Sequence, residues 1–143
     1  MGNSIIEEAK QIASQSQMAY LATARDGRPS VRPILPAWDS DALWIAATTG
    51  SPKMRDVQDN ERVELFWHLT DDFHHLTIRG TAEVVTDAAE KKRMWDVFSI
   101  DLSEYYGDAG SEWYGLMKIT PTRIECSSLD EIRNGASPRV WRA

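Results

Sequence analysis

An Asp-Gly pair at positions 26 and 27 separates two apolar, β-compatible runs, and this pattern restricts the fold more than any other. Both central residues of a type I′ turn need positive φ angles, so Asp-Gly is among the strongest short-range hairpin signals. The run before the turn extends over residues 18–25, and the run after it over residues 29–38. The sequence therefore predicts an antiparallel β-hairpin near the N-terminus.

Prolines at positions 29, 33 and 36 interrupt the second run. Proline has no backbone N–H and cannot donate to a β-ladder. Such a strand lies at a sheet edge, or bends, or turns its free face to something other than a strand. The run is therefore not predicted as a regular central strand.

The remaining chain alternates short strands with helices. Further strands are predicted over 42–48, 62–69, 74–86, 114–120 and 123–128, with Gly80 as a bulge, a turn at Thr70-Asp71-Asp72 and Pro121 at the last turn. Helices are predicted from Ser4, with Glu7 completing a capping box, from Pro52 to Asn60, and from Asp87 through Phe98. Residues 99–113 are predicted to be irregular, and residues 129–143 have no clear period. The pattern indicates one domain over residues 1–143, a mainly β fold with a closed or partly closed β-barrel and flanking helices.

Composition narrows the function classes. The 143-residue chain has 16 Lys and Arg against 22 Asp and Glu, a net charge of −6. Because no basic run is present, neither a nucleic acid nor a membrane surface is expected as a partner. Cys126 is the only cysteine, which excludes an intrachain disulfide and a multi-cysteine zinc site. No apolar run could span a membrane and no signal peptide is recognisable, so we expect a cytoplasmic protein.

The segment Thr48-Thr49-Gly50-Ser51-Pro52-Lys53 combines a strand end, a glycine and a helix start. A helix N-terminus exposes unpaired N–H groups and a partial positive charge. Ser51 adds a hydroxyl and Lys53 a full charge, so the segment suits a phosphate. A Ser-Pro pair is also simply a favourable helix start, and spacing alone favours that structural interpretation.

Other residues that could carry chemistry give weaker signals. Arg32 could pair with an anion or a polar ring edge, although such an arginine is more often a surface or ion-paired residue. His68, His74 and His75 flank one turn, but no further ligand is apparent, so no metal site is predicted. Cys126 lies in a predicted strand and is interpreted as a buried, inert thiol.

Three short motifs follow one another along the chain. They are Gly27-Arg28-Pro29-Ser30-Val31-Arg32-Pro33-Ile34-Leu35, then Gly50-Ser51-Pro52-Lys53 with Asn60-Glu61-Arg62-Val63, then Gly80-Thr81-Ala82-Glu83. In the same order, they are similar to three sequence patterns of one protein family: G-x-P-x-x-R-x-V-L, then G-S-R-K followed by N-P-R-V, then G-x-A-E. In order and spacing over residues 18–86, the set resembles the FMN-binding split barrels related to pyridoxamine 5′-phosphate oxidase, especially the short, general-stress-protein-like members.

The resemblance implies a six- to seven-stranded antiparallel split β-barrel. It also implies that two copies form a homodimer with two FMN sites at the subunit interface. It assigns Arg32, Ile34 and Leu35 to the flavin ring and ribityl chain, and Ser51 and Lys53 to the phosphate. His75 matches a polar position that reaches the flavin from the partner subunit. The implied cofactor-binding set is Arg32, Pro33, Ile34, Leu35, Ala46, Ala47, Thr48, Ser51, Lys53 and His75.

The implied function is that of an FMN-dependent oxidoreductase with an undefined small-molecule substrate. Its alternatives are a flavin-binding or stress-response protein without turnover, an F420-dependent reductase of the same fold, and a dimer that has lost its cofactor. Pro52 and Ala37 replace an arginine and a lysine of the family pattern. Residues 133–142 do not reproduce the Arg- and His-bearing substrate segment of the true oxidase, so oxidation of vitamin B6 is not expected.

Overall fold

The computed structural model describes residues 2–69 and 73–143, with side chains from residue 5 onward. Helix α1 (Gly2–Gln15) precedes strands β1 (Ala19–Arg25), β2 (Arg28–Ile34), β3 (Ala37–Asp39) and β4 (Ala42–Thr48). Helix α2 (Pro52–Asp59), strands β5 (Arg62–His68) and β6 (His75–Val85), and helices α3 (Ala88–Trp95) and α4 (Ser103–Tyr106) follow. Strand β7 (Tyr114–Ser127), helix α5 (Leu129–Arg133) and strand β8 (Arg139–Arg142) complete the described chain.

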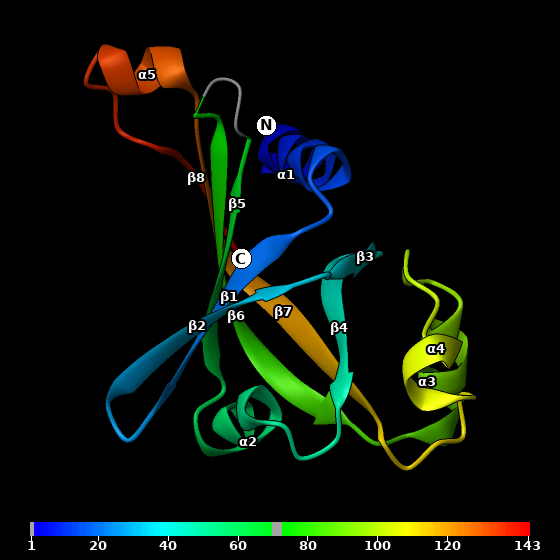
Figure 1. Cartoon of the computed structure of the whole chain (residues 1–143). Coiled ribbons are helices and arrows are strands. Elements are labelled where there is room, and N and C mark those ends of the chain that lie inside the picture. The colour runs from blue at the N-terminus through cyan, green and yellow to red at the C-terminus, as the bar shows by residue number, and fades with distance from the viewer. Residues whose placement is uncertain (1, 70–72) are drawn as a thin grey trace.

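The strands of the described residues form one antiparallel, eight-stranded sheet in the order β2-β1-β5-β6-β7-β4-β3, with β8 added to β7. The two ends of this order, β2 and β3, are separated along the chain by Leu35 and Pro36 alone. The sheet must therefore curl until its ends meet, which gives a barrel that is open along one seam (Figure 1). The predicted mainly β split barrel with flanking helices is confirmed.

The local signals around the first hairpin are also confirmed. Asp26 and Gly27 have φ angles of 52° and 74°, and Arg25 pairs directly with Arg28. Strand β2 lies at the end of the sheet order, as its prolines require. The predicted strand over 29–38 is divided at Leu35-Pro36, because the chain there leaves one end of the sheet and joins the other.

The prediction of a turn at Pro121 is wrong. Strand β7 runs without interruption from Tyr114 to Ser127 beside β6. Pro121 faces Gly80, where the register shifts between Arg79 and Gly80, so the predicted bulge absorbs the missing proline donor. A Cβ on Gly80 would lie 2.7 Å from the Thr120 carbonyl oxygen, and only glycine permits this close approach without a shift.

Several predicted boundaries also differ from the structure. Helix α1 begins at Gly2, which places Ser4 inside the helix instead of at its N-cap, and α3 ends at Trp95 instead of Phe98. The segment predicted to be irregular contains the short helix α4, and the tail forms α5 and β8. The predicted turn over residues 70–72 lies outside the described residues.

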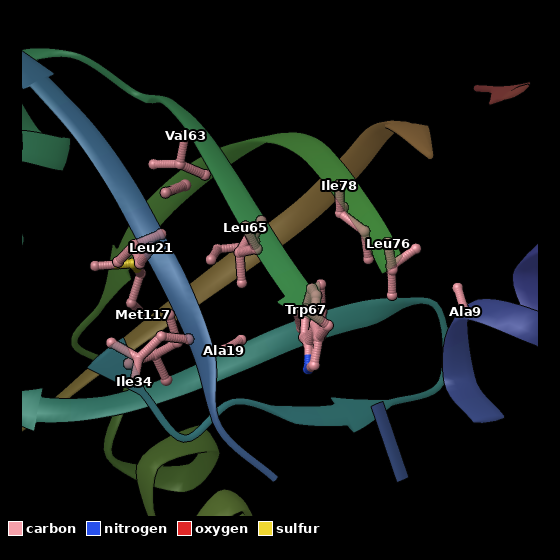
Figure 2. Packing of buried hydrophobic residues seen from close by; sticks show 14 of the residues in the cluster. Ala9, Ala19, Leu21, Ile34, Val63, Leu65, Trp67, Leu76, Ile78 and Met117 are labelled. Carbon is pink, nitrogen blue, oxygen red and sulfur yellow. The ribbon is translucent and has the colours of Figure 1, made fainter. Parts of the chain in front are cut away.

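The main core fills the barrel. Figure 2 shows side chains from α1, β1, β5, β6 and β7, among them Leu21, Leu65 and Ile78, that pack inside it. Cys126 belongs to this core, and burial raises the pKa of its thiol to about 12, as expected of an inert thiol. A second cluster, which includes Trp44 and Tyr114, joins β4 and β7 to α3 and the segment after it. No helix of the described residues is long and apolar enough to span a membrane.

A charged cluster ties the two ends of the chain together. The guanidinium of Arg139 donates to the carboxylate of Glu8 in α1 at 2.8 Å and to that of Glu131 in α5 at 3.0 Å. The carboxylate of Glu8 also lies 2.9 Å from Nε2 of His74. Hydrogen bonds from Arg139 are the largest cause that lowers the pKa of Glu8 and of Glu131 below 4.5.

Replacing Arg139 with alanine should flatten the acid dependence of stability. Because the folded pKa values of Glu8 and Glu131 are lowered, their contribution is present above the unfolded pKa and is lost as pH falls through the folded pKa values. We expect Arg139→Ala to lower the free energy of unfolding at about pH 7 and to approach wild type at an acid pH below the folded pKa values of the two glutamates, measured by urea unfolding. Arg142→Ala is the control. An equal loss for Arg139→Ala at both pH values would contradict this prediction.

Candidate functional site

Helix α2 begins after a short loop at the end of β4. A hydrogen bond to the segment before β7 holds this loop in place. The φ of Gly50 is 74°, and Ser51 has the extended conformation of an N-cap, with Pro52 at the helix start. The N–H of Thr49 donates to the carbonyl of Trp113 at 3.0 Å. The helix N-terminus is therefore fixed between β4 and the start of β7.

The hydroxyl of Ser51 is the distinctive group of this loop. An N-cap serine ordinarily accepts a hydrogen bond from an N–H in the first helical turn. The N-cap residues Asp87 of α3 and Ser128 of α5 do so, but Ser51 does not. Its Oγ is buried and has no hydrogen-bond partner among the described residues. Both this hydroxyl and the first N–H groups of α2 can therefore bind an anion.

Lys53 adds a positive charge to the first turn of α2. Its side chain is partly buried. Burial, followed by the charge of nearby Arg32, lowers the pKa of Lys53. A neighbouring cation disfavours the charged lysine, whereas an anion bound at the same place would favour it. The electrostatics of the pair thus agree with a phosphate site.

Arg32 reaches toward helix α2 from the inner side of the β1–β2 hairpin. Its Nη1 donates to Oγ1 of Thr23 at 2.7 Å, and its Nη2 lies 3.5 Å from the Asp56 carboxylate. Thr23 donates to the same carboxylate at 2.7 Å, and Thr23 and Asp56 are only 2% and 7% exposed. This buried network holds the guanidinium at the helix end of the site, near Lys53. Arg32 itself does not line the apolar cavity described next, although Pro33 and Ile34, the following residues of β2, do.

An apolar cavity of about 260 Å³ adjoins Lys53. Its lining residues are Met18, Pro33, Ile34, Leu35, Ile45, Ala46, Lys53 and Ile100. The fold thus brings together the end of β2, the middle of β4 and the start of α2, all of which the sequence resemblance placed at one site. An apolar wall that ends at a cation suits a flat apolar ring with an anionic tail.

Some lining residues escaped the sequence analysis. Met18 immediately precedes β1, and Ile45 is the neighbour of the predicted Ala46. Ile100 comes from the segment between α3 and α4, where no local pattern marks it. In the same region the hydroxyl of Tyr106 lies 3.4 Å from Oγ1 of Thr48, at the rim of the loop. Only the tertiary fold reveals that this segment borders the site.

The other predicted residues lie apart from the cavity. Ala47 is 3% exposed and packs in the main core, and it does not line the cavity. His75 begins β6, with its Nδ1 2.9 Å from the carbonyl oxygen of Phe73 and its ring 5.7 Å from that of Phe66. Within one chain, His75 is therefore not brought to the cavity. His74 instead pairs with Glu8, as described above.

Comparisons with known proteins agree with this fold. The sequence model of the family described as pyridoxamine 5′-phosphate oxidase matches residues 5–127. No curated protein matches the sequence significantly.

Solved structures give the same result. General stress protein 26 from Bacillus anthracis is similar with a TM-score of 0.77 and 20% identity over 96% of this chain and 97% of its own. An FAD-binding protein from Mesorhizobium loti has a TM-score of 0.67 and 22% identity over 85% and 93%. A structure described as an F420 reductase has a TM-score of 0.65 and 27% identity over 80% and 94%.

The absence of a cap contact predicts an unusual response to substitution at Ser51. We expect Ser51→Ala not to destabilise the ligand-free protein and to raise its free energy of unfolding by up to about 1 kcal/mol, since it removes a buried hydroxyl whose desolvation no hydrogen bond offsets. The matched control Asp87→Ala should cost about 1 kcal/mol, because Asp87 does cap its helix. Denaturant unfolding measures both. A cost at Ser51 equal to that at Asp87 would show that the Ser51 hydroxyl caps α2 after all.

Proposed function

Because the chain belongs to the pyridoxamine 5′-phosphate oxidase family, we propose that it binds FMN at the start of α2 and acts as a flavin-dependent oxidoreductase. The observation that carries the proposal is the buried, unpaired hydroxyl of Ser51 beside Lys53, at the edge of an apolar cavity. A phosphate and a flat ring are the two parts that such a site would accept.

The residues fit FMN at both of its ends. At one end, Ser51, Lys53 and Arg32 offer a hydroxyl, an ammonium group and a guanidinium near a helix N-terminus, where a phosphate dianion is stabilised. At the other end, Ile34 and Ala46 belong to an apolar wall that would cover the ring. Bound flavin would supply hydride transfer to or from a small substrate.

The chain's own contribution is positioning and electrostatics. Asp56 and Thr23 orient Arg32, so its charge stays at the phosphate end and does not move toward the ring edge. Met18 and Ile100 line the cavity from two distant segments and would shield a bound ring from water. Neither side chain can donate or accept a proton. Any proton transfer to or from the substrate would therefore need a group outside this cavity.

A second candidate is an F420-dependent reductase, which is supported by the 27% identity to the structure described under that name. Both cofactors combine a flat ring with a phosphate, so the described residues suit either. Competition between FMN and F420 for the purified protein distinguishes them. A flavin-binding protein without turnover, the third candidate, would hold flavin that neither NADH nor NADPH reduces.

The C-terminal segment argues against pyridoxamine 5′-phosphate as the substrate. Arg139, the arginine in the middle of this segment, is held by the carboxylates of Glu8 and Glu131. A guanidinium bound on two sides in this way is not available to a phosphorylated substrate. Arg139 therefore gives no support to this substrate, and we propose that the oxidoreductase acts on another small molecule.

Titration with FMN and with riboflavin, which lacks the phosphate, tests the proposed site. Lys53→Ala should weaken FMN binding about tenfold to hundredfold, because it removes a charge-assisted contact. Riboflavin affinity should change less than about threefold, since the ring wall is intact. Quenching of flavin fluorescence measures both, with the exposed Lys92→Ala as the matched control. Equal losses for FMN and riboflavin would remove Lys53 from the phosphate site.

We also propose that the site is completed by a second copy of the chain. Its cavity of about 260 Å³ is smaller than the roughly 300–1,000 Å³ of ordinary ligand pockets. Pro33, which lines it, is paired across the hairpin with Tyr20, and Tyr20 with Phe66 of β5. Tyr20 and Phe66 are 46% and 38% exposed, so an apolar row leads from the cavity across the outer face of the sheet. His75 contacts the Phe66 end of this row and would reach the partner's site.

Placing a charge in this row should separate the copies. We expect wild type to sediment as a dimer and Phe66→Arg as a monomer, because an unpaired charge cannot be buried at an apolar interface. The monomer should also bind FMN at least about tenfold more weakly if the site is shared. Tyr105→Arg, on α4, is the control and should remain dimeric. A monomeric wild type that binds FMN tightly would refute the shared site.

A further inference from the structure

The β1–β2 hairpin projects beside helix α2 (Figure 1), and its register places three arginines on one face. The register pairs Arg25 with Arg28, Thr23 with Ser30, and Leu21 with Arg32. Residues two apart in a strand point to the same side. Leu21 and Thr23 are buried, so this side is turned toward the body of the protein. Arg25 and Arg28 lie at its outer end.

The outer end of this face borders a cleft of about 400 Å³ whose lining residues are Arg25, Asp26, Arg28, Ser30 and Asp56. Asp56 lies one helical turn after Lys53, about 4.5 Å along the axis of α2. Arg32 spans the interval, with Nη1 3.4 Å from the Ser30 carbonyl and Nη2 3.5 Å from the Asp56 carboxylate. The cleft therefore lies beside the next turn of α2 after Lys53, and it shares no lining residue with the apolar cavity.

The charged residues that line this cleft are two arginines, Arg25 and Arg28, and two aspartates, Asp26 and Asp56. Arg25 and Arg28 are directly opposite each other, and like charges in such a cross-strand pair destabilise a hairpin. Neither forms an ion pair with a described residue, whereas Arg79, Arg93 and Arg139 each do. Asp56 is already engaged by Thr23 and Arg32. Asp26, between the two arginines, offsets one of their charges, which leaves one positive charge that an anion would offset.

We propose that Arg25, Arg28 and Ser30 bind a second oxyanion, a phosphate or carboxylate, one helical turn beyond the phosphate held at Ser51 and Lys53. The position of the first phosphate rests on the proposed function. Two guanidinium groups that face each other across a hairpin present planar donors suited to bidentate contacts with one such group. The oxyanion is carried either by the cofactor itself, as the second phosphate of a dinucleotide flavin, or by a separate anionic substrate.

Calorimetric titration of the double variant Arg25→Ala/Arg28→Ala tests this site and separates the two sources. FMN, FAD and inorganic pyrophosphate are the probes, and pyrophosphate is added both to the FMN-loaded and to the cofactor-free protein. The matched control is Arg133→Ala/Arg142→Ala, which removes the same charge from exposed positions of α5 and β8.

The double variant should bind FMN within about threefold of wild type, because it leaves Lys53 and Ser51 intact. It should lose about tenfold or more in affinity for FAD if the cofactor carries the second group, or for pyrophosphate on the FMN-loaded protein if a substrate does. The inference is overturned if neither affinity falls further in the double variant than in the control.

The outcomes also separate this inference from the proposed function. In one outcome, wild type binds FMN tightly and the affinities for FAD and pyrophosphate do not depend on the two arginines. This outcome leaves the proposed function intact and excludes the second site. If wild type binds no FMN, the proposed function fails, and pyrophosphate binding to the cofactor-free protein still decides the cleft. Pyrophosphate binding that depends on Arg25 and Arg28 but not on Lys53 supports the second oxyanion site. Pyrophosphate binding that depends on Lys53 but not on the two arginines overturns it.

Discussion

The missing backbone donors of β2 are the constraint on which the rest of the structure depends. Pro29 and Pro33 confine this strand to the sheet edge, and Pro36 ends it before the chain turns into β3. The two ends of the sheet, β2 and β3, are consequently joined by the connection Leu35-Pro36 and not by backbone hydrogen bonds between strands. The apolar cavity lies at this seam, lined by Pro33, Ile34 and Leu35 on one side and by β4 on the other. A hydrogen-bonded strand at the seam would fill the space that the site requires.

A second dependence is electrostatic. Helix α2 delivers Lys53 to the site and Asp56 one turn later, so the same element provides a cation for a ligand and an anion for Arg32. Without Asp56, Arg32 would have no carboxylate partner among the described residues and could move toward solvent. With it, the guanidinium is held between Thr23 and the helix. The buried carboxylate thus fixes the direction of a positive charge that the sequence alone places only on a strand.

The features that the sequence predicts well are those with local causes. The Asp26-Gly27 hairpin, the Ser51-Pro52 helix start and the bulge at Gly80 each depend on the backbone preferences of one or two residues. The turn predicted at Pro121 failed because its partner strand tolerates a proline opposite the bulge, a fact that sequence near Pro121 does not contain. The C-terminal strand β8 was missed because it is formed by pairing with β7 and by the contact of Arg139 with distant Glu8.

The same distinction separates the two ends of the candidate site. The proposed phosphate end lies in one continuous segment, residues 48–53, whose helix start the sequence predicts. The ring end combines Met18, the Pro33–Leu35 stretch, β4 and Ile100, which lie far apart in the chain. Substitutions in one of these segments can reshape the apolar wall of the cavity without disturbing the helix start at which we propose a phosphate. A fold built in this way can retain one anion site while the group attached to the anion changes.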